Sequence, residues 1–165
     1  MKVKIKKLSP LAKIPVKAHT KDFCYDVYAT SCDEVESGIW RYSLGLAFEI
    51  ERDNIPLYYP TPDTVKYLSE WYYSNFNLSI DFRPRSSIWK TGLSLCNCEG
   101  TIDELYRGEV VAYFYEVVKG RQKYQIGDRI GQIKLGITLP LEFVEEEINE
   151  DTERGTKGFG SSGLK

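Results

Sequence analysis

The sequence predicts a single domain that is built mainly from β-strands. With 165 residues, the chain is long enough for one domain with a substantial core. In several short stretches, apolar and polar side chains alternate with a period of two, as they do in strands that bury one face. One stretch has instead the spacing of an amphipathic helix. Hydrophobic residues make up 42% and charged residues 28%, which is ordinary for a globular protein.

Charge and apolar patterning argue against several functional classes. Lys and Arg number 22 and Asp and Glu number 24, so the net charge of −2 offers no overall basic surface for nucleic acid. No apolar run reaches the length that a bilayer requires, so we expect no membrane partner. The basic residues 1–13 lack the apolar centre of a secretory signal. Four cysteines and one histidine without metal spacing indicate reduced thiols in a cytoplasmic protein.

Three strand signals precede residue 51. Val3 and Ile5 alternate with lysines, which predicts a strand with one wet face that resists edge pairing. Residues 22–29 are aromatic and apolar apart from their acids, and Asp26 lies in the middle of this strand. A buried carboxylate needs a partner, so a salt bridge explains Asp26 as well as a functional role does. Residues 43–50 form the third signal.

Residues 51–78 contain the predicted helix. Thr61 is a typical capping residue, and Pro62 follows at the first helical position. Apolar side chains then recur at helical spacing: Val65, Leu68, Trp71 and Tyr72. We expect a helix over about residues 62–74 that packs on its own subunit, with a protein-binding surface as the alternative.

A long β-hairpin is predicted around GTIDELYRGE, residues 100–109. Leu93 and Leu95 precede it, and residues 110–115 alternate after it. The intervening turn is too long and too charged for a two-residue hairpin turn. Before the hairpin, residues 78–82 resemble a strand and residues 88–93 a short helical turn.

The carboxy-terminal part contains fewer signals. Lys119 and Gly120 indicate a turn, residues 141–144 a last strand, and the acidic residues 145–153 an exposed linker. The tail after residue 153 is too rich in glycine to fold by itself.

Three stretches have residue types that suit ligand binding. Arg85, Ser86 and Ser87 combine a guanidinium with hydroxyls and consecutive N–H groups, which suits an anion. Asp103 and Tyr106 place an acid and an aromatic ring in one loop. The glycine-rich tail, residues 154–163, can bring amides to phosphate, although it lacks P-loop spacing. Taken singly, a polar loop and a frayed terminus would explain the last two stretches.

Five stretches, in order, resemble the motifs of the trimeric dUTPases, enzymes that split dUTP into dUMP and pyrophosphate. They are FCYDVYA (23–29), PRSSI (84–88), GTIDELYRGE (100–109), GDRIGQI (127–133) and RGTKGFGSSG (154–163). One such match could be chance, but five in order extend the resemblance over residues 12–163.

The resemblance implies an all-β, jelly-roll-like β-clip subunit over residues 1–153. It has one inserted amphipathic helix within residues 51–78 and a flexible Gly-rich substrate-closing tail, residues 154–165. A homotrimer is also implied, with active sites at the subunit interfaces. The activity would limit uracil incorporation into DNA and supply dUMP for thymidylate synthesis.

The resemblance also implies roles for individual residues. Asp103 is the expected general base for a water that attacks the α-phosphorus, and Asp26 the outer-shell, water-mediated contact of a Mg²⁺ cofactor. Tyr106 is expected to stack on the deoxyribose. The expected phosphate-binding residues are Arg85, Ser86, Ser87, Gln132, Arg154, Gly158, Gly160, Ser161 and Ser162. The expected uracil- and deoxyribose-binding residues are Asn97, Gly100, Thr101, Ile102, Tyr106 and Phe159.

Two departures and two alternatives accompany this interpretation. The family usually has glycine at the positions of Cys24 and Ser87, which leaves the backbone conformation there open. A dCTP deaminase of the same fold carries a similar RSS motif, but it has a glutamate suited to proton shuttling and lacks the D-x-x-Y-R-G pattern. A dUTPase-like protein that regulates a partner through residues 51–78 is the alternative from a different class. Asp103 and the intact tail favour an enzyme.

Overall fold

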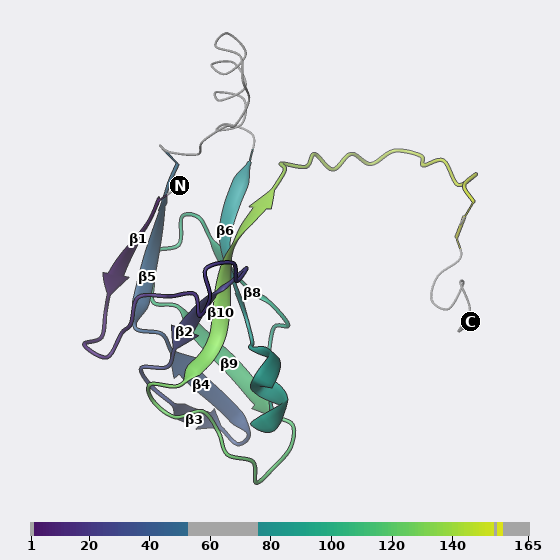
Figure 1. Ribbon diagram of the computed structural model, residues 1–165. Coiled ribbons are helices and arrows are strands. Elements are labelled where there is room, and N and C mark those ends of the chain that lie inside the picture. Colours follow the sequence, from purple (N-terminus) through teal and green to yellow (C-terminus); the bar gives the residue numbers. More distant parts are fainter. Residues whose placement is uncertain (1, 53–75, 154, 157–165) are drawn as a thin grey trace.

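The computed structural model describes residues 2–52, 76–153 and 155–156 (Figure 1). Within these ranges the chain is almost entirely β, which confirms the all-β prediction. The elements are β1 (Lys2–Lys7), β2 (Tyr25–Tyr28), β3 (Asp33–Glu36), β4 (Ile39–Ser43), β5 (Leu46–Glu51), β6 (Asn77–Arg83), the 3₁₀ turn η1 (Ser86–Lys90), β7 (Leu93–Leu95), β8 (Gly100–Asp103), β9 (Val111–Glu116) and β10 (Arg129–Thr138). The helix predicted over residues 62–74 lies outside the described residues.

The strands pair into three antiparallel sheets. β1 pairs with β5, a second sheet has the order β2-β10-β6-β8, and a third has the order β3-β4-β9-β7. Most strands that pair with each other are distant in the sequence, as β2 and β10 are. Because β10 has ten residues and pairs on both sides, it aligns the segments of the second sheet (Figure 1).

The core joins the two four-stranded sheets through aromatic rings. Tyr42 of β4 and Phe114 of β9 are fully buried, with ring centroids 5.5 Å apart and planes at 86°. Phe82 of β6 meets Phe114 edge-on at 6.4 Å, which connects the second sheet to the third. Edge-to-face pairs of this kind add to the free energy of burying the rings.

Most strand predictions are confirmed. Ala112 and Phe114 are buried whereas Tyr113 and Tyr115 are exposed, as the alternation predicted for residues 110–115 requires. The predicted strand over residues 43–50 is instead divided between β4 and β5. The break comes at Gly45, whose φ of +63° is a conformation that glycine adopts without a steric cost.

Three local predictions need correction. Gly100–Asp103 is not part of a hairpin turn, because it forms strand β8 and pairs with β6 in the other sheet. The helical turn begins at Ser86, earlier than predicted. Residues 141–144 do not form a strand, because no strand within the described part of the chain lies beside them to share hydrogen bonds.

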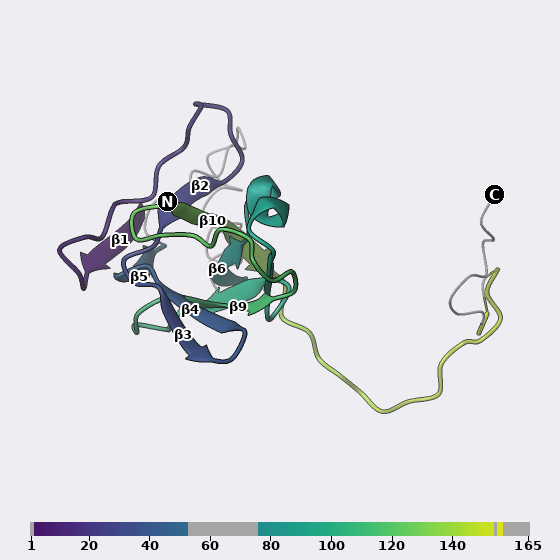
Figure 2. The ribbon, with the colours of Figure 1, turned by 90° about the horizontal axis from the view of Figure 1, so that it is seen from below.

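Residues 139–153 form an extended arm that leaves the end of β10 and runs away from the body of the subunit (Figures 1 and 2). Every side chain in the arm is exposed, and Phe143 is 91% exposed. The acidic stretch from 145 to 153 is therefore exposed, as the sequence predicts. Among the described residues, no helix has the length and apolar character needed to span a bilayer.

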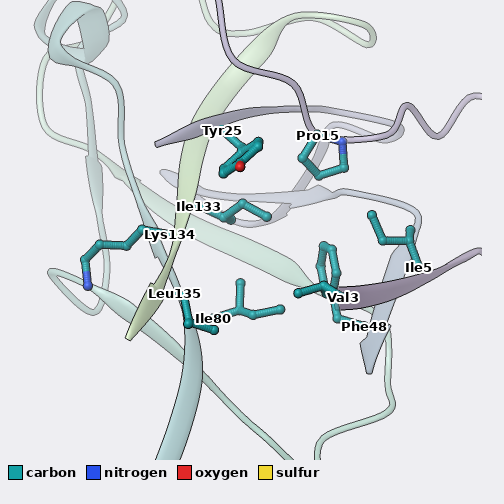
Figure 3. Close-up of a pocket in the computed structure, with 9 residues that line it drawn as sticks. All are labelled: Val3, Ile5, Pro15, Tyr25, Phe48, Ile80, Ile133, Lys134 and Leu135. Atoms are coloured by element: carbon teal, nitrogen blue, oxygen red, sulfur yellow. The ribbon is translucent and has the colours of Figure 1, made fainter. Parts of the chain in front are cut away.

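An apolar cavity of about 360 Å³ separates the small sheet from the second sheet (Figure 3). Val3 and Phe48 face it from β1 and β5, and Ile133 and Leu135 face it from β10. The side chain of Lys134, which lies between them, points away from this cavity (Figure 3). None of the predicted site residues lines it, so the polar side chains gather on the opposite face of the second sheet.

Candidate active site

Asp26 lies at the centre of a charged cluster on that polar face. The residue is only 3% exposed, and β10 places Gln132 directly opposite it. Gln132 Nε2 donates to Asp26 Oδ1 at 3.1 Å, and Arg129 Nη1 donates to Oδ2 at 3.0 Å. Arg85 Nε lies 3.3 Å from Oδ1 as an ion pair without hydrogen-bond geometry. The salt bridge considered for Asp26 is therefore present, and the cluster around it contains two of the predicted phosphate-binding residues, Arg85 and Gln132.

A β-bulge lets Arg129 join this cluster. Arg129 and Gln132 are three positions apart, so a regular strand would point them to opposite faces. Between Arg129 and Gly131, however, β10 advances two residues while β2 advances one. The extra residue turns both side chains toward Asp26. The sequence alone does not bring Arg129 to this cluster, because the bulge depends on pairing with a strand about 100 residues away.

The cluster suits an anionic ligand. Burial alone would raise the pKa of Asp26, but hydrogen bonds from Gln132 and Arg129 and the charge of Arg85 hold this pKa below its ordinary value. Asp26 is therefore ionised at neutral pH. Two guanidinium groups surround one carboxylate, so the cluster keeps a surplus positive charge.

Ser86 and Ser87 begin η1 next to this cluster. The preceding Arg85 has an extended backbone, with φ −76° and ψ 156°, and its carbonyl accepts a bond from Ile88 N at 3.0 Å. The first N–H groups of a helical turn have no carbonyl partner within the turn, so they are available to a ligand. Among the described non-glycine residues, only Cys98 has a positive φ. Neither Cys24 nor Ser87 is therefore held in a conformation that requires glycine.

A second cavity, of about 360 Å³, brings together the residues predicted to bind uracil. Four of its lining residues belong to that prediction: Asn97, Gly100, Thr101 and Ile102. The rest of the lining includes Phe82 of β6, Leu95 of β7 and Tyr113 of β9. A concave site with mixed polar and apolar walls is the usual form of a small-molecule pocket. The sequence did not reveal the apolar walls, because they come from three separate strands.

Asp103 is the last residue of β8 and is exposed beyond the cavity. The turn that follows is internally bonded: Tyr106 N donates to Asp103 O at 3.0 Å, and Tyr106 Oη donates to Glu109 O at 3.1 Å. Arg107 Nη1 donates to Glu104 O at 2.6 Å. These bonds hold the turn that follows Asp103 and fix the ring of Tyr106 beside Gly108 and Glu109.

The second sheet carries Asp26 and Asp103 on one face but at opposite edges. Cross-strand partners share a face, and the register links Asp26 to Gln132, Gln132 to Arg83 and Ser79 to Asp103. The strand order β2-β10-β6-β8 places three strand spacings, about 14 Å, between the two edges. Within one chain, the charged cluster and the exposed acid are therefore well separated.

A buried ion pair lies between them that sequence reasoning missed. Asp81 is buried, and its carboxylate pairs with Lys134 and accepts a bond from Ser79 Oγ at 2.7 Å. Burial raises the pKa of Asp81, but Lys134 and Ser79 bring it below its ordinary value. The alternation of charged residues along β6 and β10 was the available signal for this pair.

Comparisons with known proteins decide the family. The dUTPase family model matches residues 64–163. A deoxyuridine 5'-triphosphate nucleotidohydrolase of Nautilia profundicola is 31% identical to the chain, over 99% of both proteins. The chain belongs to the dUTPase family. A relative of the same name from Crocosphaera subtropica is 30% identical, over 99% of this chain and all of that protein.

Solved dUTPases share the fold. The dUTPase of Staphylococcus bacteriophage 80alpha, solved with dUPNHPP, has a TM-score of 0.68 at 21% identity and covers 99% of both chains. A mutant dUTPase of phage phi11, whose structure describes a structural Mg(II) ion, has a TM-score of 0.57 at 16% identity. It covers 93% of this chain and 99% of the phage chain.

The predicted tail residues of this dUTPase family member are not placed. Arg154, Gly158, Phe159, Gly160, Ser161 and Ser162 lie outside the described residues. Within the described ranges, no group of three His, Cys, Asp or Glu residues could hold a metal ion directly.

Proposed function

We propose that this chain is a dUTP diphosphatase that hydrolyses dUTP to dUMP and pyrophosphate. Family membership supports the activity. The observation that carries the proposal is the cavity lined by Asn97, Gly100, Thr101 and Ile102, with Asp103 at the end of the same strand. The activity would limit uracil incorporation into DNA and supply dUMP for thymidylate synthesis. The free cysteines suit a cytoplasmic location.

Asp103 is the general base in this proposal. Its exposed carboxylate can orient a water and accept its proton while the water attacks the α-phosphorus. β8 and the turn before it present backbone and side-chain polar groups of residues 97–102 to the uracil. A pyrimidine with a 4-amino group would leave some of those groups unpaired, and buried unpaired groups discriminate strongly.

Tyr106 selects the sugar. Its ring is fixed by the bond to Glu109 and by close contact with Gly108. Stacked against deoxyribose, a ring held in this way leaves no room for a 2′-hydroxyl.

The cluster around Asp26 binds the triphosphate. Arg85, Ser86, Ser87 and Gln132 offer positive charge and hydrogen-bond donors that compensate the charge of the departing pyrophosphate. A Mg²⁺ held mainly by the triphosphate would be contacted by Asp26 through water. When bound, this ion would add positive charge at the phosphate oxygens.

The sites are shared between subunits of a homotrimer. The separation of about 14 Å between the strands of Asp26 and Asp103 exceeds hydrogen-bond reach and supports sites that combine different chains. Residues 1–153 form the β domain in this proposal, and residues 154–165 close over the nucleotide. Residues 53–75, which the structure does not describe, contain none of the residues assigned to the chemistry in this proposal.

Purified protein with Mg²⁺ and each of dUTP, dCTP, dTTP and UTP tests this function, with pyrophosphate and ammonia measured separately. We expect pyrophosphate from dUTP alone and a loss of about 10²-fold in turnover for Asp103→Asn, since general-base catalysis contributes that much. Ammonia from dCTP would identify a deaminase instead. Near-normal turnover of folded Asp103→Asn would exclude Asp103 as the base.

A further inference from the structure

Arg52 connects three parts of the chain that are distant in sequence. Its Nε donates to Glu104 Oε1 at 2.5 Å, and its Nη2 donates to Glu104 Oε2. The same Nη2 donates to the backbone oxygen of Phe76 at 2.9 Å. The side chains of Arg52 and Glu104 are only 27% and 19% exposed. A two-pronged arginine–carboxylate pair is both strong and specific in geometry.

These contacts link the ends of residues 53–75 to the turn that carries the proposed chemistry. Arg52 and Phe76 flank that segment, and the Nη2 bond holds them together. Glu104 directly follows Asp103, and its carbonyl accepts a bond from Arg107. The hydrogen bonds from Arg52 hold the pKa of Glu104 below its ordinary value against the opposing effect of burial, and the charge of Arg52 and backbone bonding from Leu78 lower this pKa further. Glu104 is thus held through both its side chain and its backbone.

We propose that Arg52 is a positioning residue that holds the turn presenting Asp103 and Tyr106. The proposal rests on the proposed dUTP hydrolysis. Asp103 and Tyr106 are both exposed, so the shape of their turn depends on anchors such as Glu104. Without Arg52, the shielded carboxylate of Glu104 loses its cation and the turn shifts toward water. A displacement of about 1 Å at a reacting group can cost about 10²-fold in rate.

Four variants test the position of the turn: Arg52→Ala, Arg52→Lys, Glu104→Gln, and the exchange of Arg52→Glu with Glu104→Arg. Arg52→Ala should lower kcat for dUTP by about 10-fold to 10²-fold with a smaller change in KM, because a misplaced base acts mainly on the transition state. The preference for dUTP over UTP should also fall. Arg52→Lys should be intermediate, since an ammonium cannot make the two-pronged contact. The exchanged pair should recover part of kcat.

Glu116→Gln is the matched control. Glu116 pairs with Lys123 at 2.6 Å with comparable shielding, the side chains being 14% and 11% exposed, and it lies on β9 away from this turn. The Glu116→Gln variant should have the same kcat and the same preference for dUTP over UTP as wild type. Amide hydrogen exchange of residues 103–109 should accelerate in Arg52→Ala and not in Glu116→Gln.

Hydrogen exchange separates this inference from the proposed function. If wild type does not hydrolyse dUTP, the proposed function fails, while exchange at residues 103–109 still reports on the anchor. The positioning role would be overturned if folded Arg52→Ala matched wild type in hydrogen exchange at residues 103–109, in kcat and in the preference for dUTP over UTP. If Arg52→Ala does not fold, the same measurements are made on Arg52→Lys and Glu104→Gln. Wild-type values in both of these variants would also overturn the positioning role.

Discussion

Tyr106 keeps its position because Gly108 has no side chain. A Cβ at position 108 would lie 2.5 Å from Tyr106 Cζ, far inside van der Waals contact. Gly108 does not have a positive φ, so space for the ring, rather than backbone conformation, requires glycine here. The phenol oxygen then reaches the carbonyl of Glu109. The short motif therefore specifies a ring orientation as well as a set of residue types.

Gly108→Ala should displace the ring of Tyr106 and reduce the preference for dUTP over UTP. The backbone can accept alanine, so we expect the variant to fold. The measurement is the ratio of kcat/KM for the two nucleotides, and Tyr106→Phe, which keeps the ring but loses its bond to Glu109, separates the effect of that bond from the effect of Gly108. An unchanged ratio in Gly108→Ala would show that the ring does not exclude the 2′-hydroxyl.

Asp26→Asn should destabilise the subunit in a pH-dependent way. The folded-state pKa of Asp26 lies below its ordinary value, so its ionised form stabilises the fold above about pH 3.9. That contribution is lost as pH falls through the lower folded-state pKa. We expect a loss of about 1–3 kcal/mol in the free energy of unfolding at pH 7, typical of charged hydrogen bonds.

Urea unfolding at pH 7 and at stepwise lower pH measures this effect. The difference between wild type and Asp26→Asn should shrink in the acidic range. A difference that stays constant down to pH values below the folded-state pKa would mean that packing, rather than ionisation, gives Asp26 its effect.

At the scale of elements, β10 determines how the candidate site is assembled. Its register with β2 and β6 places Gln132 between Asp26 and Arg83, and its bulge adds Arg129. A slip of one residue would turn Gln132 into the core and Ile133 out of it, so burial of the apolar face fixes this register. The register that buries the apolar face of β10 therefore also determines which polar side chains meet on its other face.

The segment between Arg52 and Phe76 provides an element-scale prediction. No predicted site residue falls within it. Replacing residues 55–75 by a Gly/Ser linker that keeps Arg52 and Phe76 should leave turnover within a few-fold of wild type, although thermal stability can fall. The same replacement combined with Arg52→Ala should lose turnover. A loss comparable to that of Asp103→Asn with the linker alone would place part of the active site in the segment.

At the scale of the whole molecule, the exposed arm and the separation of Asp26 from Asp103 support the proposed assembly. The arm over residues 139–153 exposes apolar side chains such as Leu141 and Phe143. Exposed apolar surface of this kind usually marks an interaction site. Together with the distance between Asp26 and Asp103 along the second sheet, it favours a trimer whose sites are shared.

Hybrid trimers test shared sites directly. Asp103→Asn and a deletion of residues 154–165 should each remain folded but turn over dUTP slowly, the deletion because the tail no longer closes over the nucleotide. Refolded together, they should regain activity, because some sites then combine Asp103 from one chain with the tail of another. Light scattering should give three chains per particle. Hybrids that stay inactive would mean that each chain supplies both parts.

The sequence by itself determined the features that depend on local order. Alternation in residues 110–115 predicted which side chains are buried, and five ordered motifs were enough to indicate the family. Both signals lie in neighbouring residues, since side-chain direction in a strand follows a period of two.

Only the tertiary structure decided which distant residues meet. It paired Gly100–Asp103 with β6 instead of leaving it in a turn, and it used a bulge to bring Arg129 to Asp26. It also joined Arg52 to Glu104 across 52 positions. Strand pairing and ion pairs between remote segments depend on the packing of the whole core, so local sequence patterns do not predict them.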